Sequence, residues 1–325
     1  MSYLLYQLRR NPLMLLGLAI LAAVGLAVLL ADWVAPYDPE RIDLVHRLAA
    51  PSAAHWFGTD EVGRDIFSRV LYGGRQSIGV GLFVAGCASM AGAVIGCFSG
   101  IVGGRFDGLV MRAMDVVLSV PSLVLIMALA AALGPSLFNA MLAITLVRIP
   151  FYVRLARGQT LGIREMAYVQ AAWTFGATRR HVVRWHVVRN AASPIVVQAT
   201  LDIGGAILMA AALGFIGLGA QQPTAEWGAM VATGRNFLLD QWWYTVTPGC
   251  AILVTALACN LVGDGVRDLL DMRTGVRFSE AYLDENAEVR LLEEAIGWAP
   301  RRHPDTPHTL RDFLATLGAD GPHGG

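Results

Sequence analysis

Two ionisable residues, Arg148 and Asp202, lie inside stretches of sequence that are otherwise apolar. An ionisable side chain is costly at membrane depth, so such a residue often marks a functional site. A guanidinium binds a carboxylate through two parallel hydrogen bonds, and a carboxylate binds an ammonium group. Two interpretations stay open. Either the two residues pair with each other or with the backbone, or they line a substrate pathway and bind the two ends of a zwitterionic solute.

Other chemistry is poorly represented. All 25 basic residues are arginine, so the lysine of a P-loop is missing and any ATP must be bound by another chain. The apolar stretches contain no G-x-S-x-G, H-E-x-x-H or paired-aspartate motif. His181 and His186 have no evident third ligand, and no two cysteines form a C-x-x-C pair. We therefore expect no catalytic residue, no metal site and no cofactor bound by this chain.

The composition indicates an integral membrane protein. The 325 residues are 55% hydrophobic and 15% charged, with a mean hydropathy of +0.52. About 20 apolar residues in a helix cross a bilayer, and six stretches are long enough. The sequence thus predicts an all-α protein in a lipid bilayer, with net charge zero and no indication of a nucleic-acid partner. The expected spans are 13–31, 78–102, 116–133, 137–152, 194–219 and 244–263.

Four regions follow from these spans. They are the N-terminal cytoplasmic end with the first span (1–31), an extracytoplasmic segment (32–77), a five-helix core (78–270) and a cytoplasmic tail (271–325). The extracytoplasmic segment is predicted to contain a surface helix that starts at Thr59 or Asp60 and ends at Gly73–Gly74. In the second span, Gly92, Gly96 and Gly100 form a ridge of small residues suited to helix packing.

The loop 157–193 connects two spans and contains a short amphipathic pattern. Its apolar residues recur at i, i+3, i+4 and i+7, namely Tyr168, Ala171, Ala172 and Phe175. Gly176 follows, where a helix is expected to end. Such a helix either docks into a groove of another protein or lies on its own bundle or on lipid headgroups.

The arginines of the short loops predict the orientation. Seven of them lie in or beside the loop 157–193, including Arg179 and Arg180. Because arginine-rich loops stay in the cytoplasm, we expect this loop, the N-terminus and the C-terminus on the cytoplasmic side.

Several motifs resemble those of the dipeptide/oligopeptide/nickel permease family of ABC importers. They include Gly58-Thr-Asp-x-x-Gly-Arg-Asp65-x-x-Ser-Arg69, Gly214-Phe-Ile-Gly-Leu-Gly219 and Pro223-Thr-Ala-Glu-Trp-Gly228. Gln170-Ala-Ala followed by Gly176-Ala177 resembles the family's Glu-Ala-Ala…Gly loop, with glutamine in place of glutamate. Within the family, Pro51-Ser-Ala-Ala-His-Trp56 and Leu133-Gly-Pro-Ser-Leu-Phe-Asn-Ala140 are most similar to D,D-dipeptide (D-alanyl-D-alanine) permeases. The resemblance covers about residues 32–275.

The resemblance implies a type I ABC importer permease fold in the cytoplasmic (inner) membrane, with six transmembrane helices and a cytoplasmic coupling helix. It implies a second homologous permease subunit, two ATPase subunits that bind ATP and Mg, an extracytoplasmic solute-binding protein and a small peptide substrate. Nickel chelates, longer peptides and D,D-dipeptides all stay open as substrates. A secondary, ion-coupled transporter is the alternative function, and an intramembrane enzyme is another. The residues expected to couple to the ATPase are Tyr168, Gln170, Ala171, Ala172, Phe175, Gly176, Ala177, Arg179 and Arg180.

Overall fold

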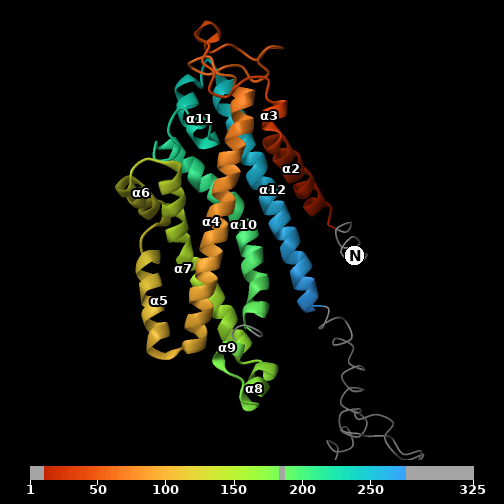
Figure 1. Ribbon diagram of the computed structural model, residues 1–325, viewed down its shortest axis with the longest axis vertical. Coiled ribbons are helices and arrows are strands. Elements are labelled where there is room, and N and C mark those ends of the chain that lie inside the picture. Colours follow the sequence, from red (N-terminus) through yellow and green to blue (C-terminus); the bar gives the residue numbers. More distant parts are fainter. Residues whose placement is uncertain (1–10, 183–186, 276–325) are drawn as a thin grey trace, which may run out of the picture. The chain divides into compact units, whose positions relative to one another are not determined.

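A computed structural model describes residues 11–182 and 187–275, and within them the regular structure is helical (Figure 1). The one β-type pairing among these residues is an isolated bridge between Thr59 and Asp65. The all-α prediction is therefore confirmed. The α-helices are α2 (Pro12–Leu29), α3 (Ala31–Val34), α4 (Ile66–Val102), α5 (Gly104–Leu118), α6 (Ser122–Leu133), α7 (Leu137–Arg164), α8 (Ala167–Thr174), α9 (Arg179–Val182), α10 (Val188–Phe215), α11 (Trp227–Gly234) and α12 (Trp242–Gly275). Two short 3-10 helices are η1 (Leu44–His46) and η3 (Arg235–Phe237).

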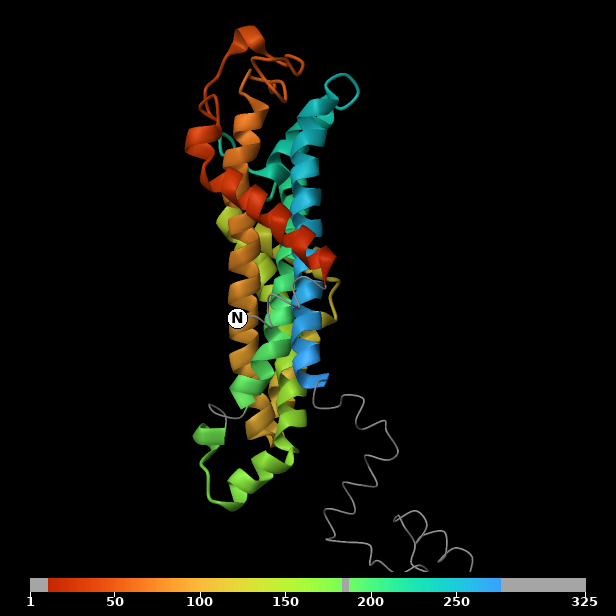
Figure 2. The ribbon, with the colours of Figure 1, turned by 90° about the vertical axis from the view of Figure 1, so that its right-hand side faces the viewer.

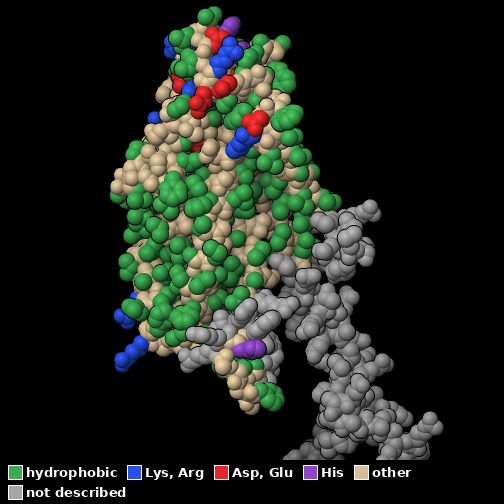
Figure 3. All heavy atoms as spheres, in the orientation of Figure 1, with side chains coloured by type: hydrophobic (Ala, Val, Ile, Leu, Met, Phe, Trp, Pro, Cys, Tyr) green, Lys and Arg blue, Asp and Glu red, His purple; other side chains and the backbone are tan. Residues whose placement is uncertain are grey.

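Five of the described helices, α2, α4, α7, α10 and α12, are long and apolar enough to cross a membrane. The pair α5 and α6 counts as a sixth span if its two bent halves are taken together. Hydrophobic side chains cover the middle of the face in Figure 3, and charged side chains gather toward its two ends. This distribution is the one a bilayer selects, because charge is tolerated at the headgroups and costly in the hydrocarbon.

The third span is not the single helix 116–133 that the hydropathy predicts. α5 ends at Leu118 and α6 begins at Ser122, and the two axes differ by 87°. Pro121 explains the break, because proline lacks the amide hydrogen of a helical bond and its ring disfavours helical backbone at the preceding residue, Val120. Hydropathy averages over such a break and does not detect it.

The predicted surface helix is also wrong in its bounds. α4 runs without interruption from Ile66 to Val102, and Asp65 caps it by accepting a hydrogen bond from the Ser68 amide at 2.8 Å. Gly73 and Gly74 do not end the helix. A Cβ atom on Gly74 would lie 2.4 Å from Val28 of α2, so this glycine allows two helices to approach.

The small-residue ridge of α4 packs against α7, as the spacing predicts. A Cβ on Gly92 would lie 2.3 Å from the Cβ of Tyr152, and one on Gly96 would lie 2.3 Å from the carbonyl oxygen of Val153. Real carbon atoms do not approach this closely, so the two helices are in contact only because these positions lack side chains. The close packing of α4 on α7 fixes the position of α7, from which the following loop starts.

Helix α2 crosses the bundle obliquely (Figure 2). Its first half contacts α12, where a Cβ on Gly17 would meet Leu261 at 2.8 Å and one on Gly265 would meet Met14 at 2.4 Å. Its last turn contacts α4 through Val28 and Gly74. Residues 1–10, 183–186 and 276–325, which include His186 and most of the predicted tail, lie outside the described residues.

Candidate functional site

The loop between α7 and α10 lies at the opposite end of the helices from the 35–65 segment that joins α3 to α4 (Figure 1). α7 ends at Arg164, and the chain then forms α8 (Ala167–Thr174) and the single turn α9 (Arg179–Val182). The helix predicted from the amphipathic spacing is thus present. Phe175 lies one residue beyond it, so Phe175 belongs to the turn and not to the helical face.

The end of α8 is a Schellman motif. Gly176 has φ +81°, and its amide donates to the carbonyl of Trp173 at 2.9 Å. The amide of Ala177 donates to the carbonyl of Ala172 at 3.0 Å. These two bonds satisfy carbonyls that a helix end otherwise leaves open, and the left-handed backbone at Gly176 is the conformation that glycine adopts most easily.

Gln170 fastens the start of α8 to the end of α7. Its side-chain amide donates to the carbonyl oxygen of Arg164 at 3.0 Å. A glutamate at this position has no hydrogen to donate when ionised. The glutamine that departs from the family pattern is therefore suited to this contact.

One face of α8 packs against the helix bundle, whereas the turn after α8 exposes an apolar side chain. Val169 is fully buried in a cluster with Ile163 and Val182, and Trp173 packs against this cluster. Phe175, in contrast, is 90% exposed. The backbone of Tyr168, Ala171, Arg179 and Arg180 lies in α8 and α9, and the arrangement of their side chains is outside the described structure.

Arg148 and Asp202 are brought together, although 54 positions separate them. Arg148 of α7 donates through Nη2 to the Oδ1 atom of Asp202 on α10, and Tyr152 donates its hydroxyl hydrogen to the other carboxylate oxygen at 3.2 Å. Asp202 is buried, whereas the Arg148 side chain is 30% exposed. Gly205 leaves room for the guanidinium, since a Cβ there would lie 3.2 Å from Nη2. The structure thus shows the two residues paired with each other, which is one of the two interpretations that the sequence left open.

Two further ion pairs connect α5 to α7 near the loop. Arg157 binds Asp107 through Nε and Nη2, both at 2.6 Å, and Ser99 donates its hydroxyl hydrogen to the same carboxylate at 2.7 Å. Arg154, about one turn before Arg157 on α7, binds Asp115 of α5. A bidentate arginine–carboxylate pair has a defined geometry, so α5 and α7 are held in register where the loop begins.

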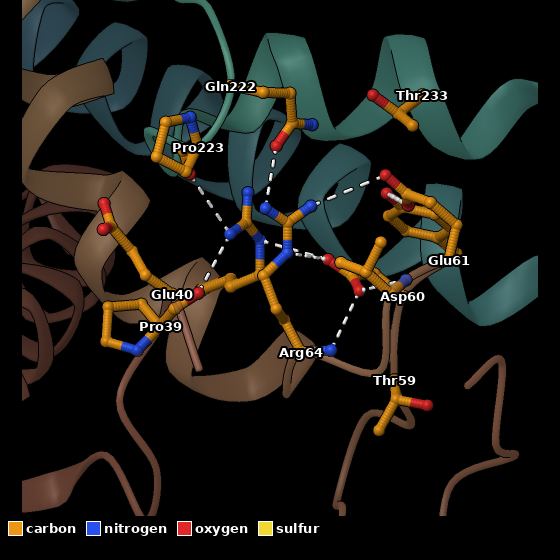
Figure 4. A network of polar contacts seen from close by, with 12 residues as sticks. Pro39, Glu40, Thr59, Asp60, Glu61, Arg64, Gln222, Pro223 and Thr233 are labelled. Atoms are coloured by element: carbon orange, nitrogen blue, oxygen red, sulfur yellow. Dashed lines mark hydrogen bonds and ion pairs between the residues drawn. The ribbon is translucent and has the colours of Figure 1, made fainter. Parts of the chain in front are cut away.

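A polar network at the other end joins the 35–65 segment to the segment before α11 (Figure 4). Arg64 binds Asp60 at 2.6 Å and donates to the side-chain oxygen of Gln222 at 2.9 Å. Arg69 donates to the carbonyl of Pro223 at 3.3 Å and lies 3.6 Å from the Asp60 carboxylate. Both arginines and the aspartate are buried. The ion pairs with Asp60 lie within residues 60–69, and losing one partner of such a buried pair costs about 3–5 kcal/mol. The contacts that cross to the segment before α11 are the hydrogen bonds from the two guanidiniums to Gln222 and Pro223.

The sequence predicts a surface helix from Thr59 or Asp60 to Gly73–Gly74 and does not predict these contacts. These residues are buried because loop segments fold over them, and the hydropathy of the local sequence does not indicate this burial. The only local signal is the i, i+4 spacing of Asp60 and Arg64.

Glu226 was likewise not predicted. It caps α11 by accepting hydrogen bonds from the amides of Gly228 and Ala229, at 2.9 and 2.8 Å, and it accepts a third from the Ser77 hydroxyl at 2.9 Å. The buried Trp227 donates its ring N–H to the carbonyl of Val70 at 2.8 Å. These contacts join α11 to α4. A carboxylate immediately before a helix is a sequence signal that could have revealed the cap.

No cluster of three or more histidine, cysteine, aspartate or glutamate side chains is arranged to hold a metal ion in the part of the chain that the structure describes. The four cysteines are free. The described residues thus form close helix packing and polar contacts near the two ends of the helices, and Arg148 pairs with Asp202 between α7 and α10.

Two family models match the chain. Residues 92–276 match the binding-protein-dependent transport system inner membrane component, and residues 2–51 match the N-terminal transmembrane domain of oligopeptide transport permease C. The first match includes α7, the following loop and α10. The chain belongs to the binding-protein-dependent permease family. The family resemblance seen in the sequence is thus confirmed, and the family is one of permeases and not of enzymes.

Relatives in this family carry peptide-transport names. The chain is 63% identical over 272 residues to the probable D,D-dipeptide transport system permease protein of Escherichia coli (strain K12), covering 84% of this chain and 91% of the relative. It is 42% identical over 269 residues to the dipeptide transport system permease protein of the same organism, covering 81% and 90%. It is 42% identical over 261 residues to the di/tripeptide permease protein of Pseudomonas aeruginosa (strain UCBPP-PA14), covering 78% and 86%. As a permease of this type, the chain is a membrane-spanning subunit of an ABC importer.

Proposed function

We propose that this permease imports dipeptides, with D,D-dipeptides as the preferred class. The support is its 63% identity to a relative named as a probable D,D-dipeptide permease, over most of both chains. The complete importer would contain a second homologous permease, two ATPase subunits that bind ATP and Mg, and an extracytoplasmic solute-binding protein. The solute-binding protein would also contribute to substrate selection. Transport assays should therefore compare dipeptides with nickel chelates and longer peptides.

The proposed orientation places the loop after α7, the N-terminus and the C-terminus in the cytoplasm. Its support is the arginine-rich sequence of that loop. The 35–65 segment then faces the extracytoplasmic side, where a binding protein would approach. The inverted orientation would require moving the seven arginines in or beside this loop across the membrane.

The observation that carries the coupling role is Phe175. A phenylalanine that is 90% exposed at the end of a hydrogen-bonded turn gains nothing for the chain's own stability. In a groove on an ATPase subunit, burying it would contribute about 1.5–3 kcal/mol. We infer that α8 and its turn, with Gln170, Ala172, Gly176 and Ala177, form the ATPase-coupling element, and that Tyr168, Ala171, Arg179 and Arg180 take part in the coupling.

ATP binding can shift the permease between inward-open and outward-open states only through contacts that differ between them. Phe175→Ala tests this role. The variant should insert and fold as the unchanged protein does, because the side chain makes little contact within the chain. Association with the ATPase subunits should weaken by about 10–100-fold, in line with the loss of a buried phenylalanine, and uptake should fall with it.

Leu239→Ala is the matched control, since Leu239 is 97% exposed and lies between η3 and α12. The preceding helix, α11, lies at the opposite end of the helices from α8 (Figure 1). The Leu239→Ala variant should leave ATPase association unchanged. The measurement is the affinity of the purified permease pair, in nanodiscs, for the ATPase subunits. Equal affinities for the Phe175→Ala and unchanged proteins would overturn the coupling assignment, and uptake without any ATPase would favour a secondary transporter.

We also propose that Arg148 and Asp202 line the substrate pathway. The support is the partial exposure of the Arg148 side chain within a membrane-spanning helix, together with its Nε atom, which is buried and has no hydrogen-bond partner among the described residues. A peptide carboxylate would compete with Asp202 for the guanidinium. Uptake of peptides with and without a free carboxylate measures this competition.

A further inference from the structure

A cavity of about 310 Å³ opens in the 35–65 segment. Two histidines, His46 and His55, are among its lining residues, together with Asp43, Asp65 and Arg41. Neither histidine belongs to the coupling element, the ion pair in the membrane or the network around Arg64. The two imidazoles therefore lie outside the sites described so far.

His46 is oriented by Asp43. Its Nδ1 atom lies 2.8 Å from the Oδ2 atom of Asp43, whose other oxygen accepts a hydrogen bond from the Val45 amide at 3.1 Å. An ionised carboxylate only accepts hydrogen bonds. In the neutral imidazole, the hydrogen on Nδ1 faces this carboxylate, which leaves the lone pair of Nε2 available.

His55 is oriented in the same way by a buried carboxylate. Its Nδ1 atom lies 3.0 Å from the Oδ1 atom of Asp65. The other Asp65 oxygen accepts hydrogen bonds from the amide and the hydroxyl of Ser68, both at 2.8 Å. The ring of Tyr37 stacks on the imidazole with centroids 4.9 Å apart. His55 thus has a fixed ring with its hydrogen on Nδ1, and its Nε2 lone pair is also available.

A carboxylate that accepts the N–H of an imidazole is the usual support of a metal-binding histidine, because it fixes the tautomer and makes the other nitrogen a better ligand. Here two such pairs face one cavity. The ring centroids of His46 and His55 are 5.9 Å apart. With metal–nitrogen distances of about 2.0–2.1 Å, one ion held by both Nε2 atoms would place the centroids about 5–6.5 Å apart.

The local charge also favours a cation. Two carboxylates, Asp43 and Asp65, lie on the cavity wall, and Arg41 is the one guanidinium among the residues that line it. Their formal sum is negative. Neutral imidazole is a preferred ligand of zinc, nickel and copper ions, which are the divalent ions least dependent on oxygen ligands.

We propose that His46 and His55 bind a divalent transition-metal ion, of the zinc or nickel class, through their Nε2 atoms. Water completes the coordination shell, so the site is exchangeable and differs from a closed structural site with four protein ligands. The bound ion would link the turn at residues 43–46 to the turn at residues 52–55 and stiffen the cavity wall.

The test is metal titration of the full-length chain in nanodiscs after chelator treatment. Zinc binding is followed by calorimetry, and cobalt, as a spectroscopic probe, is followed by its visible absorption. The unchanged chain should show one site that His46→Ala and His55→Ala each remove. His46 is the sharper position, because its side chain is 57% exposed, so we expect the fold to tolerate its truncation.

His181→Ala is the control for the other histidines, of which the chain has seven in all, and it should keep the site. Asp43→Asn should weaken binding by about 10–100-fold, as expected for loss of a supporting carboxylate. If Asp43 only stabilised its turn, Asp43→Asn would leave the metal-binding isotherm unchanged. Identical isotherms for the His46→Ala and unchanged proteins, or an unchanged cobalt spectrum, would overturn the proposal.

Discussion

A substitution at Gly176 tests the coupling element through its backbone conformation. Gly176 has φ +81°, and a Cβ built on it meets no atom within 4 Å. Replacing it with alanine therefore introduces no clash, and the entire cost is that of holding a residue with a Cβ in the left-handed region, about 1–2 kcal/mol. The perturbation changes one backbone preference and no side-chain contact.

The expected effect follows from that cost. A penalty of about 1–2 kcal/mol lowers the population of the Schellman turn relative to other loop conformations by about 5–30-fold. An ATPase subunit that binds only this turn then loses apparent affinity by up to that factor. Gly176→Asn should lose less than Gly176→Ala, because asparagine enters the left-handed region more easily than other residues with a side chain. Gly176→Trp adds bulk to the same backbone penalty and should uncouple transport further.

The assay compares substrate-stimulated ATPase activity and peptide uptake in proteoliposomes that contain the complete importer. Gly158→Ala is the matched control, since Gly158 lies in α7 with ordinary helical backbone and its Cβ would also meet nothing within 4 Å. This control should keep full activity. If Gly176→Ala and Gly176→Trp couple as well as Gly158→Ala does, the turn is not the element through which the ATPase acts.

Two further predictions concern the membrane-spanning region. Gly96→Ala should destabilise the protein by about 1–3 kcal/mol, because the new Cβ would lie 2.3 Å from the carbonyl of Val153 and would push α4 away from α7; thermal unfolding in detergent measures this, and equal stability to Gly86→Ala, where a Cβ meets nothing, would contradict the close packing. The double variant Arg148→Gln/Asp202→Asn removes both charges, so it avoids the cost of about 3–5 kcal/mol that a single charge left unpaired would bring. It should fold but transport free and C-terminally amidated dipeptides equally well, and a retained preference for the free carboxylate would exclude the proposed pathway role.

Much of the fold could be predicted from the sequence because its signals are local. An apolar run of about 20 residues indicates a span whatever surrounds it. Helices α4, α7 and α12 include the predicted stretches, whereas α2 ends two residues and α10 four residues before the predicted ends. The short helix before Gly176 and its end at that glycine were predicted for the same reason. Apolar periodicity and the backbone freedom of glycine act within one or two turns of helix.

The polar contacts depend on tertiary structure. The sequence left open whether Arg148 pairs with Asp202, and it did not predict the burial of Arg64. The structure brings Asp202 to Arg148 from another helix and covers Arg64 with Gln222, 158 positions away. The break at Pro121 and the continuity of α4 through Gly74 likewise differ from the predicted bounds.

The amino-acid sequence alone determined that this chain spans a membrane, which stretches do so and where the connecting helix ends. Only the tertiary structure decided which ionisable groups meet, which glycines serve close approach and which histidines face one cavity. The physical reason is range: hydropathy and backbone preference belong to neighbouring residues, whereas the partner of a buried polar group is set by how distant segments pack around it.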